Sequence, residues 1–164
     1  MIEKETMIEQ YLSVCRLNPL WKKEGDDLQA DIRYLYLGML AEIGEVAEIY
    51  QKNIRDNTPI NKQDVLDELG DIAFYVHMLA AKGFGDTLTC KAILSGNYSA
   101  GVIYESPMDK LLHLYHMTLS DVYETMLYIG SYYGFSLSDI LSANVTKLKR
   151  RLANGTIKGS GSHR

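Results

Sequence analysis

Two pairs of acidic residues stand three positions apart in segments whose apolar residues otherwise have helical spacing. At about 100° per residue, Glu42 falls in the middle of an apolar stripe, and Glu45 lies beside it at the edge. The second pair repeats this placement, since Glu68 falls between apolar neighbours and Asp71 lies at their margin. An unpaired carboxylate in an apolar interface costs several kcal/mol or becomes neutral, and convergence of four acids raises that cost. These acids therefore need a counter-charge.

Three kinds of counter-charge could satisfy the acids. Basic side chains are one, but the two segments offer only peripheral ones, such as Lys52, Arg55 and Lys82. A di-iron centre is the second, but ferritin-type iron bundles use Glu-x-x-His, and neither pair has histidine at the fourth position. Magnesium fits better, with manganese as the alternative ion, because it is a hard cation that prefers oxygen ligands and keeps several waters. A single Glu-x-x-Glu is common in helices, so this prediction rests on both pairs together.

The last helical segment shows the same anomaly with opposite charge. Asn144 lies in the middle of its apolar stripe, and Lys147 and Arg151 share that side of the helix. An amide, an ammonium and a guanidinium on one face suit a polyphosphate, because arginine grips phosphate oxygens with a fork and lysine supplies a point charge. Lys149 and Arg150 are better interpreted as cations that complement the dipole at the end of a helix.

Turn signals divide the chain into helical segments, and no comparable stretch alternates with the period of a strand. Asparagine, proline and glycine end the segments, while Ser106-Pro107 and Ser136 are N-terminal capping signals. The sequence therefore predicts an all-α helical bundle of about five main helices. They are Ile2 to Leu17, about Leu28 to Ile54, Val65 to Ala81, Met108 to Tyr133, and Leu137 to Leu152.

The length of 164 residues predicts one domain, which we place over residues 1–155. It contains an irregular connector at about 84–106, with a short helix near Leu88 to Leu94. Residues 156–164 are small, polar and glycine-rich, which predicts a flexible tail.

Composition excludes several classes of protein. A net charge of −4 and a pI near 5.5 argue against binding of duplex nucleic acid, which needs a basic face. The first ten residues do not form a signal peptide, and no run of apolar residues is long enough to span a membrane. Two distant cysteines, Cys15 and Cys90, favour reduced thiols and a cytoplasmic location.

Three segments, in this order, make the chain resemble the MazG-like all-α nucleoside triphosphate pyrophosphohydrolases. They are GMLAEIGEVAEIYQKNIRD (38–56), DELGDIAFYV (67–76) and SANVTKLKRR (142–151). The metal motif of that family, Glu-x-x-Glu followed by Glu-x-x-Asp, falls on Glu42, Glu45, Glu68 and Asp71. Its Asn-x-x-Lys-Leu-x-x-Arg element falls on Asn144, Lys147, Leu148 and Arg151, and Lys52 occupies a position where relatives often carry a phosphate-facing lysine.

The resemblance implies hydrolysis of a nucleoside triphosphate between the α and β phosphates, giving monophosphate and pyrophosphate. The four acids would bind magnesium, and Lys147 and Arg151 would hold the leaving polyphosphate. One of the acids, with Glu45 as the candidate, would accept the proton of the attacking water. The substrate class would be deoxynucleoside or non-standard triphosphates, removed from the nucleotide pool.

Aromatic residues near the acids are candidates for stacking on a base: Trp21, Tyr34, Phe74 and Tyr75. The apolar and tyrosine side chains between Met108 and Tyr133 predict a surface that packs on another subunit, and the resemblance also implies a homo-oligomer, most simply a homodimer. The alternative function is that of a non-catalytic helical module, which binds a nucleotide or a protein and retains the acidic motif for stability.

Overall fold

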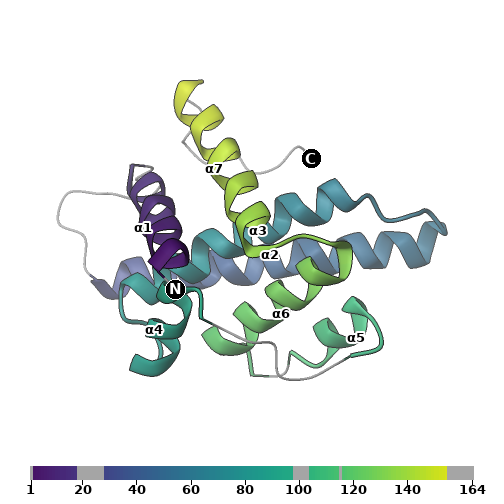
Figure 1. Ribbon diagram of the computed structural model, residues 1–164. Helices are drawn as coiled ribbons and strands as arrows, with labels where there is room; N and C mark the ends of the chain where they lie inside the picture. The colour runs from purple at the N-terminus through teal and green to yellow at the C-terminus, as the bar shows by residue number, and fades with distance from the viewer. Residues whose placement is uncertain (1, 18–27, 98–103, 115, 155–164) are drawn as a thin grey trace.

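The computed structural model describes residues 2–17, 28–97, 104–114 and 116–154. These residues form seven α-helices and no strand, so the predicted all-α class is confirmed (Figure 1). The helices are α1 (Ile2–Arg16), α2 (Leu28–Asp56), α3 (Lys62–Ala81), α4 (Thr87–Ser95), α5 (Pro107–Leu112), α6 (Leu119–Tyr133) and α7 (Leu137–Ala153). Trp21 and the predicted tail over 156–164 lie outside the described residues, as does the part of the connector from 98 to 103.

Helix α3 is the centre of the bundle. It runs beside α2 as the second arm of a long hairpin, and it also contacts α1, α4, α6 and α7 (Figure 1). Its N-terminus is capped by Asn61, whose side chain accepts a hydrogen bond from the backbone nitrogen of Gln63. From Leu69 to Ala80 every residue except Tyr75 is buried, which is expected of a helix that is apolar on most of its circumference.

Helix α7 crosses α3 at a point where one residue has no side chain. A Cβ atom on Gly70 would lie 3.2 Å from the Cβ of Asn144 and 3.4 Å from the backbone oxygen of Ile140. Glycine therefore allows the two helices to approach closely at this crossing. Helix α7 starts at a capping box, in which Ser136 and Asp139 bond each other's backbone nitrogens, and α1 packs against its other side.

The predicted helix from Met108 to Tyr133 is wrong as a single element. The chain forms α5 and α6 instead, with a break in which Met117 has a left-handed φ of 50°. Thr118 then caps α6, because its hydroxyl accepts a hydrogen bond from the backbone nitrogen of Asp121. Apolar spacing continues through the break, so the capping chemistry of Thr118 marks the boundary better than periodicity does.

Two smaller expectations can be compared with the described residues. The short helix expected near Leu88 to Leu94 is confirmed as α4, which begins at the N-cap Asp86. Cys15 and Cys90 are both buried and free, so they form no disulfide. Among the described helices, none has the length and apolar character that crossing a lipid bilayer requires.

Candidate metal centre

Three of the four predicted acids converge between α2 and α3. Glu42 of α2 and Glu68 and Asp71 of α3 each place one carboxylate oxygen within 4.8 Å of those of the other two. We call these three residues the acidic group. It is the only set of three or more potential metal ligands that close together in the described parts of the chain. Glu42 and Glu68 are half-buried and Asp71 is 8% exposed, so their charges are only partly screened by water.

Crowding of negative charge changes the acidity of two members of this group. Burial raises the pKa of Glu42 to about 8, and repulsion from Asp71, Glu45 and Glu68 adds to this increase. Burial also raises the pKa of Glu68 to about 7, where attraction by Lys147 acts in the opposite direction. Near neutral pH, Glu42 and Glu68 are therefore easier to protonate than ordinary glutamates.

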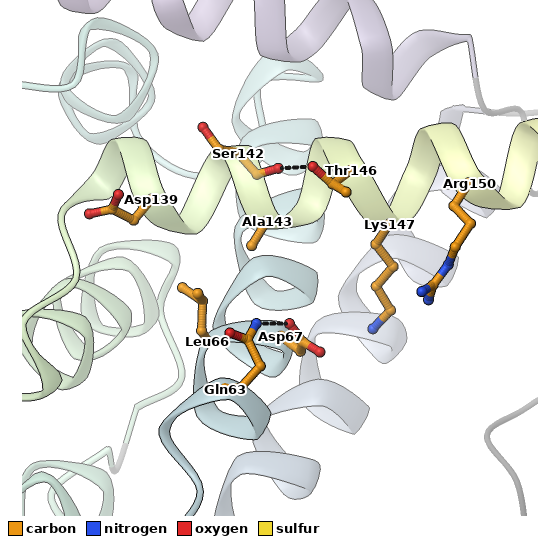
Figure 2. Close-up of a pocket in the computed structure, with 9 residues that line it drawn as sticks. All are labelled: Gln63, Leu66, Asp67, Asp139, Ser142, Ala143, Thr146, Lys147 and Arg150. Carbon is orange, nitrogen blue, oxygen red and sulfur yellow. Dashed lines mark hydrogen bonds between the residues drawn. The ribbon is translucent and has the colours of Figure 1, made fainter.

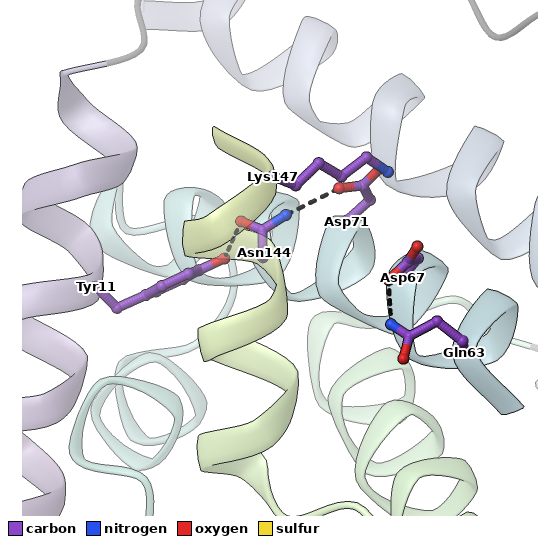
Figure 3. A network of polar contacts seen from close by, with 6 residues as sticks. All are labelled: Tyr11, Gln63, Asp67, Asp71, Asn144 and Lys147. Carbon is purple, nitrogen blue, oxygen red and sulfur yellow. Dashed lines mark hydrogen bonds and ion pairs between the residues drawn. The ribbon is translucent and has the colours of Figure 1, made fainter. Parts of the chain in front are cut away.

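Asp71 differs from the two glutamates because both of its oxygens are engaged by α7. The amide nitrogen of Asn144 donates a hydrogen bond of 2.8 Å to Oδ1, and the ammonium of Lys147 forms an ion pair with Oδ2 (Figure 3). Charge-assisted contacts of this kind are the strongest hydrogen bonds in proteins. Asn144 and Lys147 therefore face the acidic group, and their predicted contact with a polyphosphate stays a prediction.

Tyr11 of α1 completes this network, and sequence reasoning missed it. Its hydroxyl donates a hydrogen bond of 2.9 Å to Oδ1 of Asn144, across 133 residues of sequence (Figure 3). Because the amide oxygen accepts this bond, the amide nitrogen is turned toward Asp71. Burial raises the pKa of Tyr11 well above its ordinary value, so the hydroxyl stays protonated and can donate. Tyr11 is an apolar-stripe tyrosine in the sequence, and no spacing signal distinguishes it.

A cavity of about 470 Å³ is lined by residues of α3 and α7, none of which belongs to the acidic group. Lys147 connects the two, because it lines the cavity and also pairs with Asp71. Arg150 lines the cavity as well, although its sequence position was interpreted only as that of a helix-end cation (Figure 2). Arg151 is half-buried and is not among the lining residues.

Two further predicted charges lie outside the acidic group. Glu45 is half-buried and near enough to raise the pKa of both Glu42 and Glu68, but its carboxylate is not one of the three that converge. Lys52 is exposed on α2 and pairs with Glu48, one helical turn away, at 3.0 Å. The phosphate-facing role of Lys52 stays a prediction.

The two aromatic candidates on α3, Phe74 and Tyr75, differ in how deeply they are buried. Phe74 is 3% exposed, and its ring meets that of Tyr75 edge to face, with 5.1 Å between the centroids. Tyr75 is half-buried and lies over Gly38 of α2, where an added Cβ would come within 2.3 Å of the tyrosine ring. Burial raises the pKa of Tyr75, and repulsion from Tyr34 and Glu42 adds to it, which places this residue near the acidic group.

The chain matches no family model, no curated protein and no solved structure. The motif residues and their geometry are therefore what indicates a function.

Proposed function

We propose that this protein is a magnesium-dependent hydrolase that cleaves nucleoside triphosphates between the α and β phosphates, releasing monophosphate and pyrophosphate. The observation that carries the proposal is the convergence of Glu42, Glu68 and Asp71, from two helices, next to cations presented by a third. Oxygen-only donors beside a basic surface are what a metal-bound polyphosphate requires. Removal of unwanted triphosphates from the nucleotide pool, in the cytoplasm, is the corresponding cellular role.

The acidic group fits magnesium, or manganese, by its chemistry. All three donors are carboxylates, and neither histidine nor cysteine belongs to the set, which disfavours zinc and softer metals. Burial is the main cause of the raised pKa values of Glu42 and Glu68, with repulsion between carboxylates as a further cause, and a bound divalent cation would favour the ionised forms of both. When bound, the ion would neutralise charge on the phosphate oxygens and make a water molecule more acidic.

The side chains of α7 supply the other parts of the reaction. Lys147 lies between the acidic group and the cavity, where its ammonium can bind a phosphate oxygen. Asn144 holds Asp71 in place by a hydrogen bond and thereby orients a metal ligand. Glu45 is the candidate proton acceptor. Its carboxylate is close enough to Glu42 and Glu68 to raise their pKa values, but it is not one of the three proposed metal ligands.

The first test is pyrophosphate release from a panel of ribo- and deoxynucleoside triphosphates in the presence of magnesium. We expect Glu42→Gln and Asp71→Asn to lower the rate by about a hundredfold or more, since loss of even an outer-shell partner often costs that much. Glu48→Gln is the matched control, because Glu48 is an exposed glutamate of α2 outside the acidic group.

Product identity and metal binding decide between the enzyme and a non-catalytic module. Monophosphate plus pyrophosphate supports the proposal, whereas stepwise loss of single phosphates would contradict it. Full activity in both acidic variants would remove the acidic group from the mechanism. If millimolar magnesium does not raise the melting temperature of the wild-type protein, mass action gives no evidence of a metal site, and the binding-module alternative is favoured.

Self-association stays a prediction that the surface supports. Large apolar side chains are exposed on α2, where Leu37 is 66% and Ile54 is 65% exposed, and Tyr132 of α6 is also exposed. Burying such side chains against a second copy is the usual origin of a homodimer. Sedimentation velocity should give the mass of a dimer or a larger oligomer, and the mass of a monomer at micromolar concentration would contradict this.

A further inference from the structure

The cavity between α3 and α7 has a composition that no metal-binding role explains. Its volume of about 470 Å³ is within the usual range for small-molecule sites. Leu66 of α3 and Ala143 of α7 provide apolar surface, and Figure 2 shows Ala143 projecting from α7 toward the α3 side chains. The remaining lining residues are polar or charged, so one ligand would meet both kinds of surface.

Charge in this cavity is divided between the two helices and along α7. Lys147 and Arg150 extend from the C-terminal half of α7, while Gln63 and Asp67 project from the first turns of α3 (Figure 2). The cavity residues of α7 run from Asp139 to Arg150, which is roughly 16 Å of helix at 1.5 Å per residue. The cavity is therefore basic toward one end and neutral or acidic toward the other.

The two cations at the basic end differ in their contacts with the described residues. Lys147 already pairs with Asp71, but Arg150 is exposed and forms no ion pair or hydrogen bond with any described residue. Across the cavity, on α3, Asp67 accepts a hydrogen bond of 2.8 Å from the amide nitrogen of Gln63 and is held in place by it (Figure 3). Asp67 stands one helical turn before Asp71, the partner of Lys147, whereas Asp139 lies at the start of α7 and uses Oδ2 in the capping box. Asp67 is therefore the acidic lining residue closer to the cations, and it can accept from a ligand.

We propose that this cavity binds the nucleoside end of the substrate, with Arg150 and Lys147 holding its phosphates. The proposal rests on the proposed function and adds where the base and sugar lie. A nucleotide matches the cavity because its anionic tail suits the basic end beside the acidic group, and its base suits the apolar surface of Leu66 and Ala143. Asp67 then accepts from a donor on the nucleoside, either an amino group of the base or a sugar hydroxyl.

The test compares a nucleotide with its phosphates alone. The probes are α,β-methylene ATP, which resists cleavage at the proposed bond, and inorganic tripolyphosphate, both titrated calorimetrically in the presence of magnesium. Ala143→Trp fills the middle of the cavity, and Ala153→Trp is the matched control at the exposed end of the same helix. Thr146→Trp blocks the cavity from an exposed position whose hydroxyl bonds only its own helix, and it serves if Ala143→Trp does not fold.

We expect both cavity variants to weaken binding of α,β-methylene ATP by about tenfold or more, while tripolyphosphate binds as to the wild type. Ala153→Trp should change neither affinity. Equal losses for the two probes, or no loss for either, would overturn the proposal. So would a wild-type protein that binds the two probes with the same affinity, because the nucleoside would then contribute nothing.

A second arm tests the basic end separately. Arg150→Gln should weaken both probes by about tenfold, and Lys149→Gln, which removes a neighbouring exposed charge outside the cavity, should weaken them far less. An Arg150 variant with wild-type affinity for both probes would contradict the assigned role of that residue. If the wild type cleaves triphosphates and Ala143→Trp does not change binding of α,β-methylene ATP, the proposed hydrolase function is retained. The nucleoside would then bind outside this cavity.

Discussion

Asp71 and His77 are buried polar residues on the same helix, less than two helical turns apart, and the protein treats them in opposite ways. Both oxygens of Asp71 are engaged by α7, through Asn144 and Lys147. His77 is fully buried, and although its Nδ1 lies 2.8 Å from the backbone oxygen of Ala73, its Nε2 has no hydrogen-bond partner among the described residues. The first residue is met by a hydrogen-bond donor and a cation, whereas the second lies among apolar and aromatic neighbours without a counter-charge among the described residues.

Aromatic rings explain how His77 is tolerated. The rings of Tyr11 and Tyr123 lie edge to face with its imidazole, at centroid distances of 5.3 and 5.6 Å. Burial lowers the pKa of His77 to about 4, with the contact to Ala73 acting in the opposite direction. Tyr11 belongs to both regions, because its ring touches His77 and its hydroxyl bonds Asn144. One helix can therefore hold both a polar site and an apolar core when the counter-charges contact only one part of its length.

The largest expected effect concerns acid stability of the histidine region. A lowered folded pKa means that stability is complete above pH 6.5, the ordinary pKa of histidine, and is lost as the pH falls toward 4. The shift corresponds to about 3 kcal/mol. We expect the free energy of unfolding of the wild type to fall by that amount more than that of His77→Leu, measured by urea denaturation from pH 7 to pH 4. Parallel curves for the two proteins would contradict the assignment.

Removing the counter-charge from the acidic region should have the next largest effect. Lys147→Met leaves Asp71 buried without its ion-pair partner, which in fully buried pairs costs more than the pair itself contributes. The side chain of Lys147 is still 20% exposed, so we expect a smaller loss, about 2 kcal/mol in the free energy of unfolding. Lys149→Met, at an exposed position of the same helix, is the control. If the control lost as much free energy of unfolding, the effect would come from a change in α7 in general and not from loss of the ion pair.

The affinity of the acidic group for magnesium should depend on pH. Because the folded pKa values of Glu42 and Glu68 are raised to about 8 and about 7, the metal-free fold is favoured by their neutral forms. That contribution is complete below pH 4.5, their ordinary pKa, and is lost as the pH rises through 7 and 8. Protons compete with the metal for both carboxylates, so affinity for magnesium should weaken by about a hundredfold or more from pH 8 to pH 6.

Calorimetric titration of magnesium at the two pH values measures this dependence, with Glu42→Gln as the comparison. The variant lacks the more strongly perturbed carboxylate, so its affinity should be lower and change less with pH. A wild-type affinity that is constant between pH 6 and pH 8 would show that these carboxylates are not the metal ligands.

The smallest expected effect comes from the residue that the two regions share. Tyr11→Phe keeps the ring beside His77 and removes the hydroxyl that orients Asn144. We expect the free energy of unfolding to fall by about 1 kcal/mol, the usual net value of one buried hydrogen bond. Magnesium affinity should also weaken, since Asn144 would no longer be fixed toward Asp71. Loss of stability with unchanged magnesium affinity would limit Tyr11 to a structural role.

Local signals predicted much of this molecule. The side-chain caps at Ser106 and Ser136 mark real helix starts, and helical spacing alone brought Glu42, Glu68 and Asp71 to facing sides of two helices. The break before Thr118 was missed because apolar spacing runs across it. Periodicity describes which face of a helix is apolar, so it indicates that acids on such faces will meet, provided the helices pack in an ordinary hairpin.

What local signals could not predict depends on how helices cross. Arg150 lines the cavity, and Tyr11 reaches Asn144, because of the angle at which α7 passes over α3 and of the position of α1 beside it. The spacing of residues within one helical segment predicts neither of these two contacts. Both follow from packing between distant parts of the chain, which helical-wheel reasoning does not address.

The distance between α3 and α7 at the site depends on Gly70, a residue that has no side chain of its own. Gly70 directly precedes Asp71, and the atom nearest to its absent side chain is the Cβ of Asn144. An added methyl group would require Asn144, and α7 with it, to move back by a few tenths of an ångström. A change as slight as alanine, at a residue without a functional atom, would therefore be transmitted to the hydrogen bond between Asn144 and Asp71.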